Sequence, residues 1–295
     1  MNRKDTALGI CAALTANIIF GFSFMFSKIA LQYARPLTIL AVRFTVAFII
    51  MTLLWAFGII KLNFKGKSIK KLVIMAVMQP LLYFIFELYG IDNTSSAISG
   101  IIISLVPVGV IIISLLFLSE KPTKLQIISS AVSLAAVILI SIYGNNGGKN
   151  NIIGVVLLLL AVVCAAVFNI LSQSEADKFT PFERTYMMFL VGSVGFNIIA
   201  AISLGKTYLS DISTNIVIPE FDFAIIYLAV ISSILAFMLY NFATSKIDAV
   251  RAASFSNIIT VVSVFAGIVI LNEQLSVFQI ICCLLIIAGV YGVNK

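Results

Sequence analysis

Ten long apolar runs, each separated from the next by a short polar break, constrain the fold of this chain more than any other feature. Each run has about 20 residues, the length that an α-helix needs to cross the hydrocarbon core of a bilayer. Only 11% of the residues are charged and 61% are hydrophobic, so the chain cannot make an ordinary water-facing surface. The sequence therefore predicts an all-α integral membrane protein.

The apolar runs predict ten transmembrane helices. In chain order they cover residues 8–32, 37–58, 71–91, 95–118 and 123–143, then 152–172, 182–204, 222–244, 249–271 and 276–293. The breaks between them, including the polar segment 205–220, have turn or loop chemistry, and none is long enough for a soluble domain. Pro80 and Pro107 lie inside predicted helices and are expected to bend them.

Lysine and arginine residues gather in every second break. With the N-terminus in the cytoplasm, fourteen of them fall in the inner segments and three, Arg35, Lys149 and Lys206, fall in the outer loops. An excess of positive residues on the inside is the bias that orients membrane proteins. We therefore expect a multi-pass protein of the cell (cytoplasmic) membrane, with both termini in the cytoplasm.

Short motifs recur in the two halves of the chain. At an offset of 153 residues, Leu118-Ser-Glu120 and Gln126 match Leu271-Asn-Glu273 and Gln279. At an offset of 145 residues, Ser27-Lys28 and Pro36 match Ser172-Gln173 and Pro181. These matches indicate that the halves are related.

Five spans lie on each side of the linker Gly144–Gly148. An odd number of spans forces the second half to enter the membrane in the opposite sense from the first. The predicted organisation is therefore two inverted five-helix repeats, residues 1–144 and 145–295.

Several residues of the first half carry a family resemblance. They are Asn17 to Lys28, then Pro36 and Arg43, Ala97 with Pro107, and Leu118-Ser-Glu120. This pattern resembles the EamA-type branch of the drug/metabolite transporter superfamily over nearly the whole chain. The resemblance implies two repeats in ten helices, a central cavity, and efflux or exchange of metabolites, amino acids or drugs. Where that family often has a proline in the ninth helix, this sequence has Thr260.

Lys28, Arg43 and Glu87 are the ionisable residues deepest in the predicted spans. Each costs roughly 2.5 to 3.5 kcal/mol at a helix centre, so each needs compensation. The helix directions place all three toward the outer face, where they can meet. We hypothesise that Glu87 partly neutralises the two cations and leaves a net positive site for a carboxylate or other anionic group of a substrate. In the alternative, the cations reach the outer headgroups and Glu87 reaches water at its helix end.

Polar side chains within the spans complete the predicted substrate site. Gln79 and Tyr83 precede Glu87 by eight and four residues, so the three share roughly one face of the third helix. Glu87 is the only acidic side chain well inside a predicted span, and it is the candidate for proton coupling. The second half contributes five candidates, for each of which helix packing is the alternative role: Asn169, Gln173, Tyr240, Asn241 and Asn257.

Two glutamates near helix starts have a structural interpretation. Thr123 with Gln126, and Ser276 with Gln279, have the spacing of capping boxes that open the fifth and tenth helices. Glu120 and Glu273 precede these starts, where an acidic group suits the helix dipole. We therefore do not count them as substrate residues.

Several classes of function are excluded by composition. Histidine is absent, and the four cysteines lie inside apolar runs without metal-ligand spacing, so no metal site, disulfide or cofactor is predicted. Paired acids, a nucleophile with its base and a phosphate-binding loop are also missing, which argues against an enzyme. The net charge of +7 comes from scattered basic residues, an arrangement that does not predict nucleic-acid binding.

The sequence therefore predicts a transporter that exports a small metabolite such as an amino acid by alternating access, a function that rests on the family resemblance. Its predicted partners are the small-molecule substrate, the lipid bilayer and, in a proton-coupled mechanism, protons. Import or exchange of a nucleotide-linked or sugar metabolite is the closest alternative within transport. A non-transporting membrane partner or sensor is the alternative outside it.

Overall fold

A computed structural model of the chain describes residues 3–118, 123–125, 128–129, 131–132, 135–136, 139, 151–215, 218–247, 252–253 and 255–293. At 3–4, 114–118, 215, 257, 290 and 292–293 it describes the backbone only. All regular structure in these ranges is helical. The prediction of an all-α protein is confirmed for this part of the chain.

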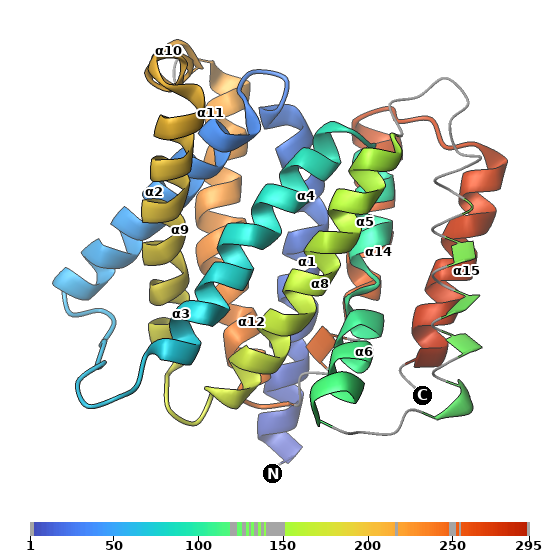
Figure 1. The fold of residues 1–295 in the computed structure, drawn as a ribbon, viewed down its shortest axis with the longest axis horizontal. Coiled ribbons are helices and arrows are strands. Elements are labelled where there is room, and N and C mark those ends of the chain that lie inside the picture. The colour runs from blue at the N-terminus through green and yellow to red at the C-terminus, as the bar shows by residue number, and fades with distance from the viewer. Residues whose placement is uncertain are drawn as a thin grey trace.

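The described part of the first half forms four helical rods, of which the second and third are strongly tilted in Figure 1. The first two are α1 (Arg3–Ala30) and α2 (Pro36–Ala56). The third consists of α3 (Lys70–Ala76), the π-helical segment η1 (Val77–Leu82) and α4 (Tyr83–Asp92). The fourth consists of α5 (Ser96–Ile103) and α6 (Val106–Leu118). Most of the predicted span 123–143 lies outside the described residues.

The second half begins with α8 (Ile152–Ser174) and α9 (Pro181–Leu204). The next rod consists of α11 (Pro219–Ile226), η2 (Tyr227–Leu235) and α12 (Ala236–Thr244). Next come α14 (Asn257–Phe265) with η3 (Ala266–Ile270), and then α15 (Val277–Val293). Among the described residues, seven helices are long and apolar enough to cross a membrane, and Ile258–Ile270 and Val277–Gly289 are shorter apolar helices.

The polar segment 205–220, predicted as a loop, contains a helix, α10 (Lys206–Asn215). This helix packs on the ends of α2 and α9 through polar contacts. Tyr208 Oη donates to Asn197 Oδ1 at 2.6 Å, and Asp211 accepts a hydrogen bond from Thr38 at 3.3 Å. The expectation was wrong because apolar runs reveal spans, whereas this short helix is polar and lies beyond them.

Both prolines that were expected to bend helices lie at breaks. Gln79, just before Pro80, has φ −146° and ψ 116°, which are extended and not helical values. The chain leaves the helix at 104–105, and Pro107 is the second residue of α6. Proline lacks a backbone N–H and restricts the residue before it, so a helix is readily interrupted there.

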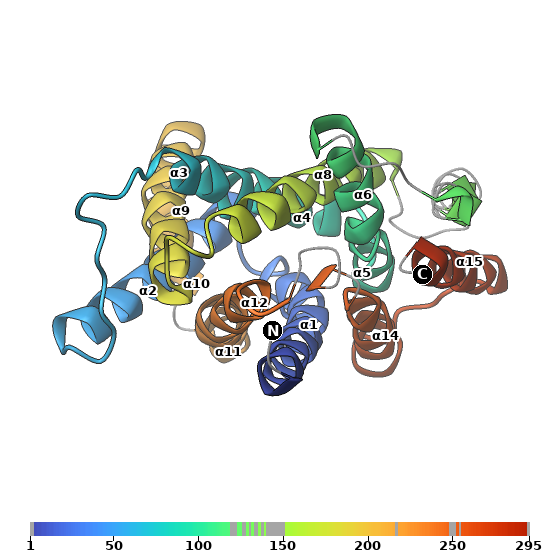
Figure 2. The ribbon, with the colours of Figure 1, turned by 90° about the horizontal axis from the view of Figure 1, so that it is seen from below.

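Helices from the two halves pack side by side. Seen from below, α1 lies between α12 and α14, and it contacts both (Figure 2). Other close pairs across the halves include α2 with α9, α4 with α8, and α5 with α14. A Cβ on Gly100 of α5 would lie 1.9 Å from Ser263 Oγ of α14, so this approach requires glycine. The core is therefore shared between the halves.

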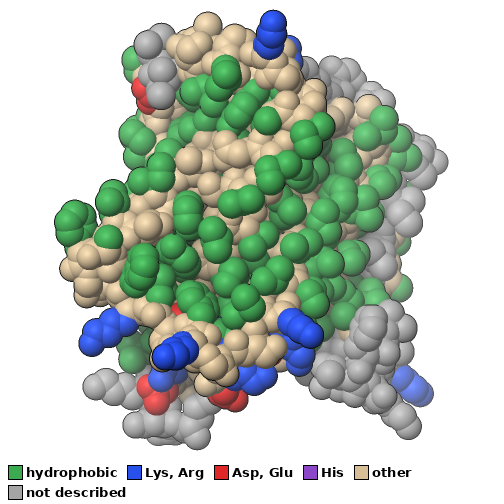
Figure 3. Space-filling view, turned by 60° about the vertical axis from the view of Figure 1, so that its left-hand side comes forward, with side chains coloured by type: hydrophobic (Ala, Val, Ile, Leu, Met, Phe, Trp, Pro, Cys, Tyr) green, Lys and Arg blue, Asp and Glu red, His purple; other side chains and the backbone are tan. Residues whose placement is uncertain are grey.

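The outer surface has the polarity of a membrane protein. In Figure 3, hydrophobic side chains cover a broad band, and most of the Lys, Arg, Asp and Glu side chains in view lie at the lower end, where the N-terminus is. Large apolar side chains such as Ile202 (80% exposed) and Phe223 (65% exposed) point outward. A soluble bundle would bury such groups, so these helices face lipid.

The predicted capping box at the start of α15 is confirmed, because Ser276 Oγ accepts from Gln279 N at 3.2 Å and Gln279 Oε1 accepts from Ser276 N at 2.8 Å. Glu273, however, does not serve this helix. Its carboxylate accepts from the backbone N–H groups of Ser96 at 2.8 Å and Ala97 at 3.1 Å, in the first turn of α5. The residue is structural, as expected, but it joins the two halves. Glu120 and Gln126 lie outside the described residues.

Candidate functional site: a cavity between the two halves

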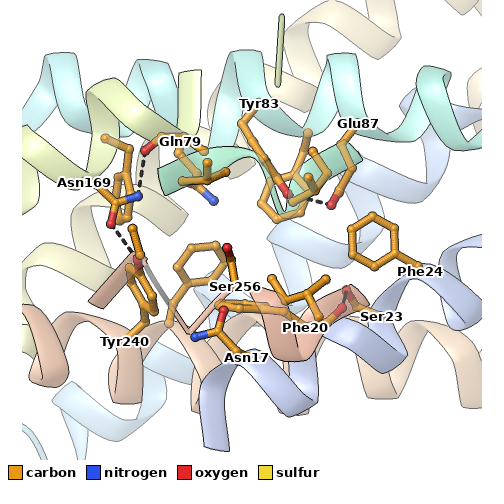
Figure 4. A pocket seen from close by; sticks show the side chains of 18 residues that line it. Asn17, Phe20, Ser23, Phe24, Gln79, Tyr83, Glu87, Asn169, Tyr240 and Ser256 are labelled. Carbon is orange, nitrogen blue, oxygen red and sulfur yellow. Dashed lines mark hydrogen bonds between the residues drawn. The ribbon is translucent and has the colours of Figure 1, made fainter. Parts of the chain in front are cut away.

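A cavity lies between helices of both halves; it has about 560 Å³ of atom-free space, part of which is open to solvent. Its walls come from α1, η1, α4, the junction of α5 and α6, α8, α12 and the segment around the start of α14 (Figure 4). Most of the lining is apolar or aromatic, with a small set of polar groups, a composition typical of small-molecule sites. Those polar groups are Asn17, Ser23, Gln79, Tyr83, Glu87, Asn169, Tyr240 and Ser256.

One wall is built by the interrupted third rod. The break at Gln79 turns its amide toward the cavity, and Tyr83 and Glu87 follow at intervals of four residues on the same face. Tyr83 Oη donates a hydrogen bond of 2.8 Å to Glu87 Oε1. The structure thus brings together the three residues that were predicted to share one face.

The opposite wall comes from the second half. Tyr240 Oη on α12 donates to Asn169 Oδ1 on α8 at 2.5 Å, and Asn169 Nδ2 donates to the Ala165 carbonyl at 2.8 Å. Both side chains are more than nine-tenths buried. Asn169 and Tyr240, predicted as separate candidates, therefore form one hydrogen-bonded unit in the cavity wall.

Helix α1 contributes cavity residues that the sequence prediction did not include. Asn17, Phe20 and Phe24 recur at helical spacing, and Ser23 lies beside Phe24. Phe20 packs edge-on against Phe237, with ring centroids 5.1 Å apart. The sequence signal was present, because Asn17 is an amide within an apolar run that shows this periodicity.

Arg43, one of the two predicted substrate cations, is buried but does not line the cavity. Its Nε donates to Ser233 Oγ at 2.9 Å, and one terminal nitrogen donates to Ser232 Oγ at 3.2 Å. The guanidinium lies 4.3 Å from the ring centroid of Phe84, which itself lines the cavity. Arg43 thus binds η2 and the ring of Phe84.

Lys28 lies at the end of α4. Its Nζ donates to the carbonyls of Ile91 at 2.6 Å and Thr94 at 2.5 Å. The three predicted ionisable groups do lie at neighbouring levels, since Ile91 follows Glu87 by about one turn and Phe84 precedes it by about one turn. Among the described residues, however, no ion pair joins Glu87 to either cation.

The other predicted candidates have different surroundings. Gln173 is exposed on α8, away from the cavity. Asn241 is fully buried, accepts from Ser172 Oγ at 2.9 Å and donates to Thr185 Oγ1 at 2.9 Å. The side chain of Asn257 lies outside the described residues.

A buried arginine that was assigned to an inner segment lies beside Asn241. Arg184 is 0% exposed and donates to the Asn241 carbonyl and, at 2.7 Å, to both the carbonyl and the hydroxyl of Ser172. The Thr180–Glu183 capping box places Arg184 in the first turn of α9, and its burial comes from the packing of that turn against α8 and α12.

Among the described residues, no group of three or more Cys, Asp or Glu side chains is placed to hold a metal ion. The cavity contains one carboxylate in that part of the chain, with a tyrosine hydroxyl bound to it.

One family model, that of the EamA-like transporter family, matches residues 7–142 and again residues 152–295. The chain belongs to the EamA-like transporter family. The suspected resemblance is thereby confirmed, and the protein is a membrane transporter of a family that is not enzymatic.

Among relatives, the uncharacterized transporter YcxC of Bacillus subtilis (strain 168) is 35% identical over 289 residues, covering 96% of this chain and 91% of the relative. An uncharacterized transporter of Archaeoglobus fulgidus is 26% identical over 288 residues, covering 97% and 98%. A solved crystal structure superposes with a TM-score of 0.59 at 16% identity over 99% of this chain and 96% of that one. This last likeness shows the fold alone.

Proposed function

We propose that this transporter exports a small metabolite such as an amino acid across the cell membrane by alternating access, with the cavity as its substrate site. The observation that carries the proposal is the cavity itself. Polar groups from both halves gather around one space within otherwise apolar spans. Because polar groups are costly inside a bilayer, this gathering supports solute binding.

We infer that the complete chain has ten transmembrane helices in two inverted five-helix repeats. The directions of the helices support this inference. The last turn of α1 lies beside the last turn of α4, because Lys28 of α1 binds a carbonyl there. The first turn of α8 also lies beside the end of α4, because Asn151 N donates to the Asn93 carbonyl at 3.0 Å. The first helices of the two halves thus run in opposite senses, as inverted repeats require.

We infer that the end of the bundle carrying the N-terminus faces the cytoplasm. Lysine-rich segments support this orientation, because Lys61, Lys65, Lys67, Lys70 and Lys71 all lie at or beside the connection between α2 and α3. Most charged groups in Figure 3 lie at that end. Positive residues are retained on the cytoplasmic side of a membrane.

In alternating access, contacts between the halves at the two ends of the cavity break in turn. Two contacts are suited to this role. Glu273 binds the first turn of α5 at one end, and at the other Lys246 pairs with Asp5 at 3.3 Å, joining the turn after α12 to α1. Glu87 is the candidate to carry a coupled proton, because it is the carboxylate of the cavity in the described part of the chain.

The proposal is tested by transport in liposomes that contain the purified protein. Radiolabelled amino acids and related metabolites are loaded inside, and release is followed with and without a pH gradient. We expect Gln79→Ala to lower the rate about tenfold or more, because its amide faces the cavity. The matched control is Gln32→Ala, an exposed amide outside this cavity. Equal rates for Gln79→Ala and the wild type would show that the cavity is not the transport site.

A further inference from the structure

The hydroxyl groups around the cavity all donate to protein acceptors. Ser23 donates to the Phe20 carbonyl at 2.6 Å, Tyr83 to Glu87 at 2.8 Å, Tyr240 to Asn169 at 2.5 Å and Ser256 to the Ser104 carbonyl at 3.2 Å. A hydroxyl has one proton, so once it donates, only its lone pairs remain for a ligand. These four groups therefore present acceptors to the cavity.

The amides and the carboxylate add further hydrogen-bond acceptors to those that the wall offers a ligand. Asn17 and Asn169 each use one N–H on the carbonyl four residues earlier, at 2.7 and 2.8 Å. Glu87 Oε1 is held by Tyr83, and Oε2 has no hydrogen-bond partner among the described residues. Donors do remain, in the amide of Gln79 and one N–H of each asparagine. The charged group, however, is an acceptor.

The apolar part of the wall is largely aromatic. Phe20, Phe24, Phe84, Phe168, Phe237 and Tyr240 line the same space as Glu87. The faces of such rings carry negative potential and attract cations, most strongly where water is excluded. They repel a carboxylate for the same reason.

The two nearby cations, Arg43 and Lys28, do not line the cavity and so do not offer a substrate carboxylate a direct partner. Arg43 lies against the ring of Phe84 and donates to two serines, and Lys28 donates to two carbonyls at the end of α4. Neither is among the lining residues. In the described part of the wall, a substrate carboxylate would lose its water without gaining a cation, which is costly.

We propose that the cavity selects organic amines, with the ammonium group bound by Glu87 Oε2 and the hydrocarbon or aromatic part packed against the phenylalanine rings. This inference rests on the proposed function and narrows its substrate class, because it favours an amine over the amino acid that has the same side chain. The sequence predicted two cations in the substrate site; in the described part of the cavity wall the charged side chain is instead the carboxylate of Glu87.

The test compares tyramine with tyrosine, which differ only by the carboxylate. Binding of each radiolabelled compound to purified wild-type protein is measured by equilibrium dialysis, and uptake is measured in liposomes. We expect tyramine to bind about tenfold more tightly or better, since one desolvated charge interaction is enough for such a factor. Equal binding, or tighter binding of tyrosine, would overturn the inference.

A pair of variants then tests the role of the carboxylate. Glu87→Gln should weaken tyramine binding about tenfold or more, whereas Glu220→Gln, the same change at an exposed residue of α11, should leave it unchanged. Tyr83→Phe is the companion variant, because it frees Glu87 Oε1 and should preserve the preference for tyramine over tyrosine. Loss of that preference in Tyr83→Phe, or normal tyramine binding by Glu87→Gln, contradicts the inference.

The outcomes separate the two proposals. Transport of tyrosine without tyramine removes the amine preference and leaves the proposed export of amino acids standing. Failure of the wild-type protein to move any compound of the panel removes both.

Discussion

The C-terminal ends of α4 and α12, the third rods of the two halves, meet the same electrostatic problem in different ways. At the end of α4, Lys28 comes from α1 and donates to the carbonyls of Ile91 and Thr94. At the end of α12, Arg184 comes from α9 and donates to the carbonyl of Asn241 and to Thr244 Oγ1 at 3.1 Å. In each case a cation donates to a carbonyl in the last turn of the helix that also accepts a hydrogen bond from a nearby threonine, and its charge suits the negative end of the helix dipole.

The two cations do not occupy equivalent positions in the sequence. At the offset of 145 residues, Lys28 corresponds to Gln173, which is exposed, and Arg184 corresponds to Ile39, which is 0% exposed. Each half therefore places its cation on a different helix. What both halves retain is the need to satisfy a helix end that water cannot hydrate freely. The residue that does so is free to vary.

The largest effect is expected for Arg184→Met. The change removes a charged donor from buried acceptors on Ser172, Asn241 and Thr244, and we expect a loss of about 3 kcal/mol of stability. The measurement is thermal unfolding in detergent, followed by the loss of helical circular dichroism. Arg35→Met is the matched control, because the side chain of Arg35 is 53% exposed. Similar melting temperatures for the two variants would show that the end of α12 does not need a buried cation.

A smaller effect is expected for Glu273→Ala. This variant tests the first turn of α5, a helix start, whereas Arg184→Met tests a helix end. Two backbone N–H groups of α5 lose a charged acceptor, which costs about 2 kcal/mol. Unfolding is measured in the same way, with Glu220→Ala as the exposed control. If Glu273→Ala melts like the wild type, this contact does not stabilise the junction of the halves.

Lys28→Gln should cost about 1 kcal/mol, less than the change at Arg184. Lys28 is only half-buried, so water can partly replace its ammonium at the two carbonyls. The variant also gives the first half the residue found at the matching position of the second. Destabilisation as large as that of Arg184→Met would mean that water is excluded equally from the ends of α4 and α12.

The smallest effect is expected for Gln173→Ala. This side chain is exposed and lies outside the cavity, so stability should change by less than about 0.5 kcal/mol and transport should keep its wild-type rate. Flux in liposomes and thermal unfolding measure the two quantities. A strong loss of transport would restore Gln173 to the substrate site predicted from the sequence.

The sequence predicted those features that depend on neighbouring residues. Gln79, Tyr83 and Glu87 share one face because their spacing is close to that of a helix, and the cavity receives them together. Helix spans in the described ranges also followed from runs of apolar residues. The polar helix α10 was missed, because its contacts with Thr38 and Asn197 come from residues far away in the chain or in another helix.

The partners of the buried charges were beyond prediction for the same reason. Arg43 contacts serines that lie about 190 residues later in the chain, and Lys28 contacts carbonyls more than 60 residues later. A pattern in the sequence shows that a charge inside a span needs compensation. It does not show whether a carboxylate, a hydroxyl or a helix end provides it.

By itself, the sequence determined that this chain is a helical membrane protein, because hydropathy acts residue by residue along each span. Only the tertiary structure decided which polar side chains share a cavity and which cations bind elsewhere. Hydrogen bonds and ring contacts depend on distances of a few ångströms between helices, and the packing of both halves sets those distances. Which charged side chains line the cavity is therefore a property of the fold.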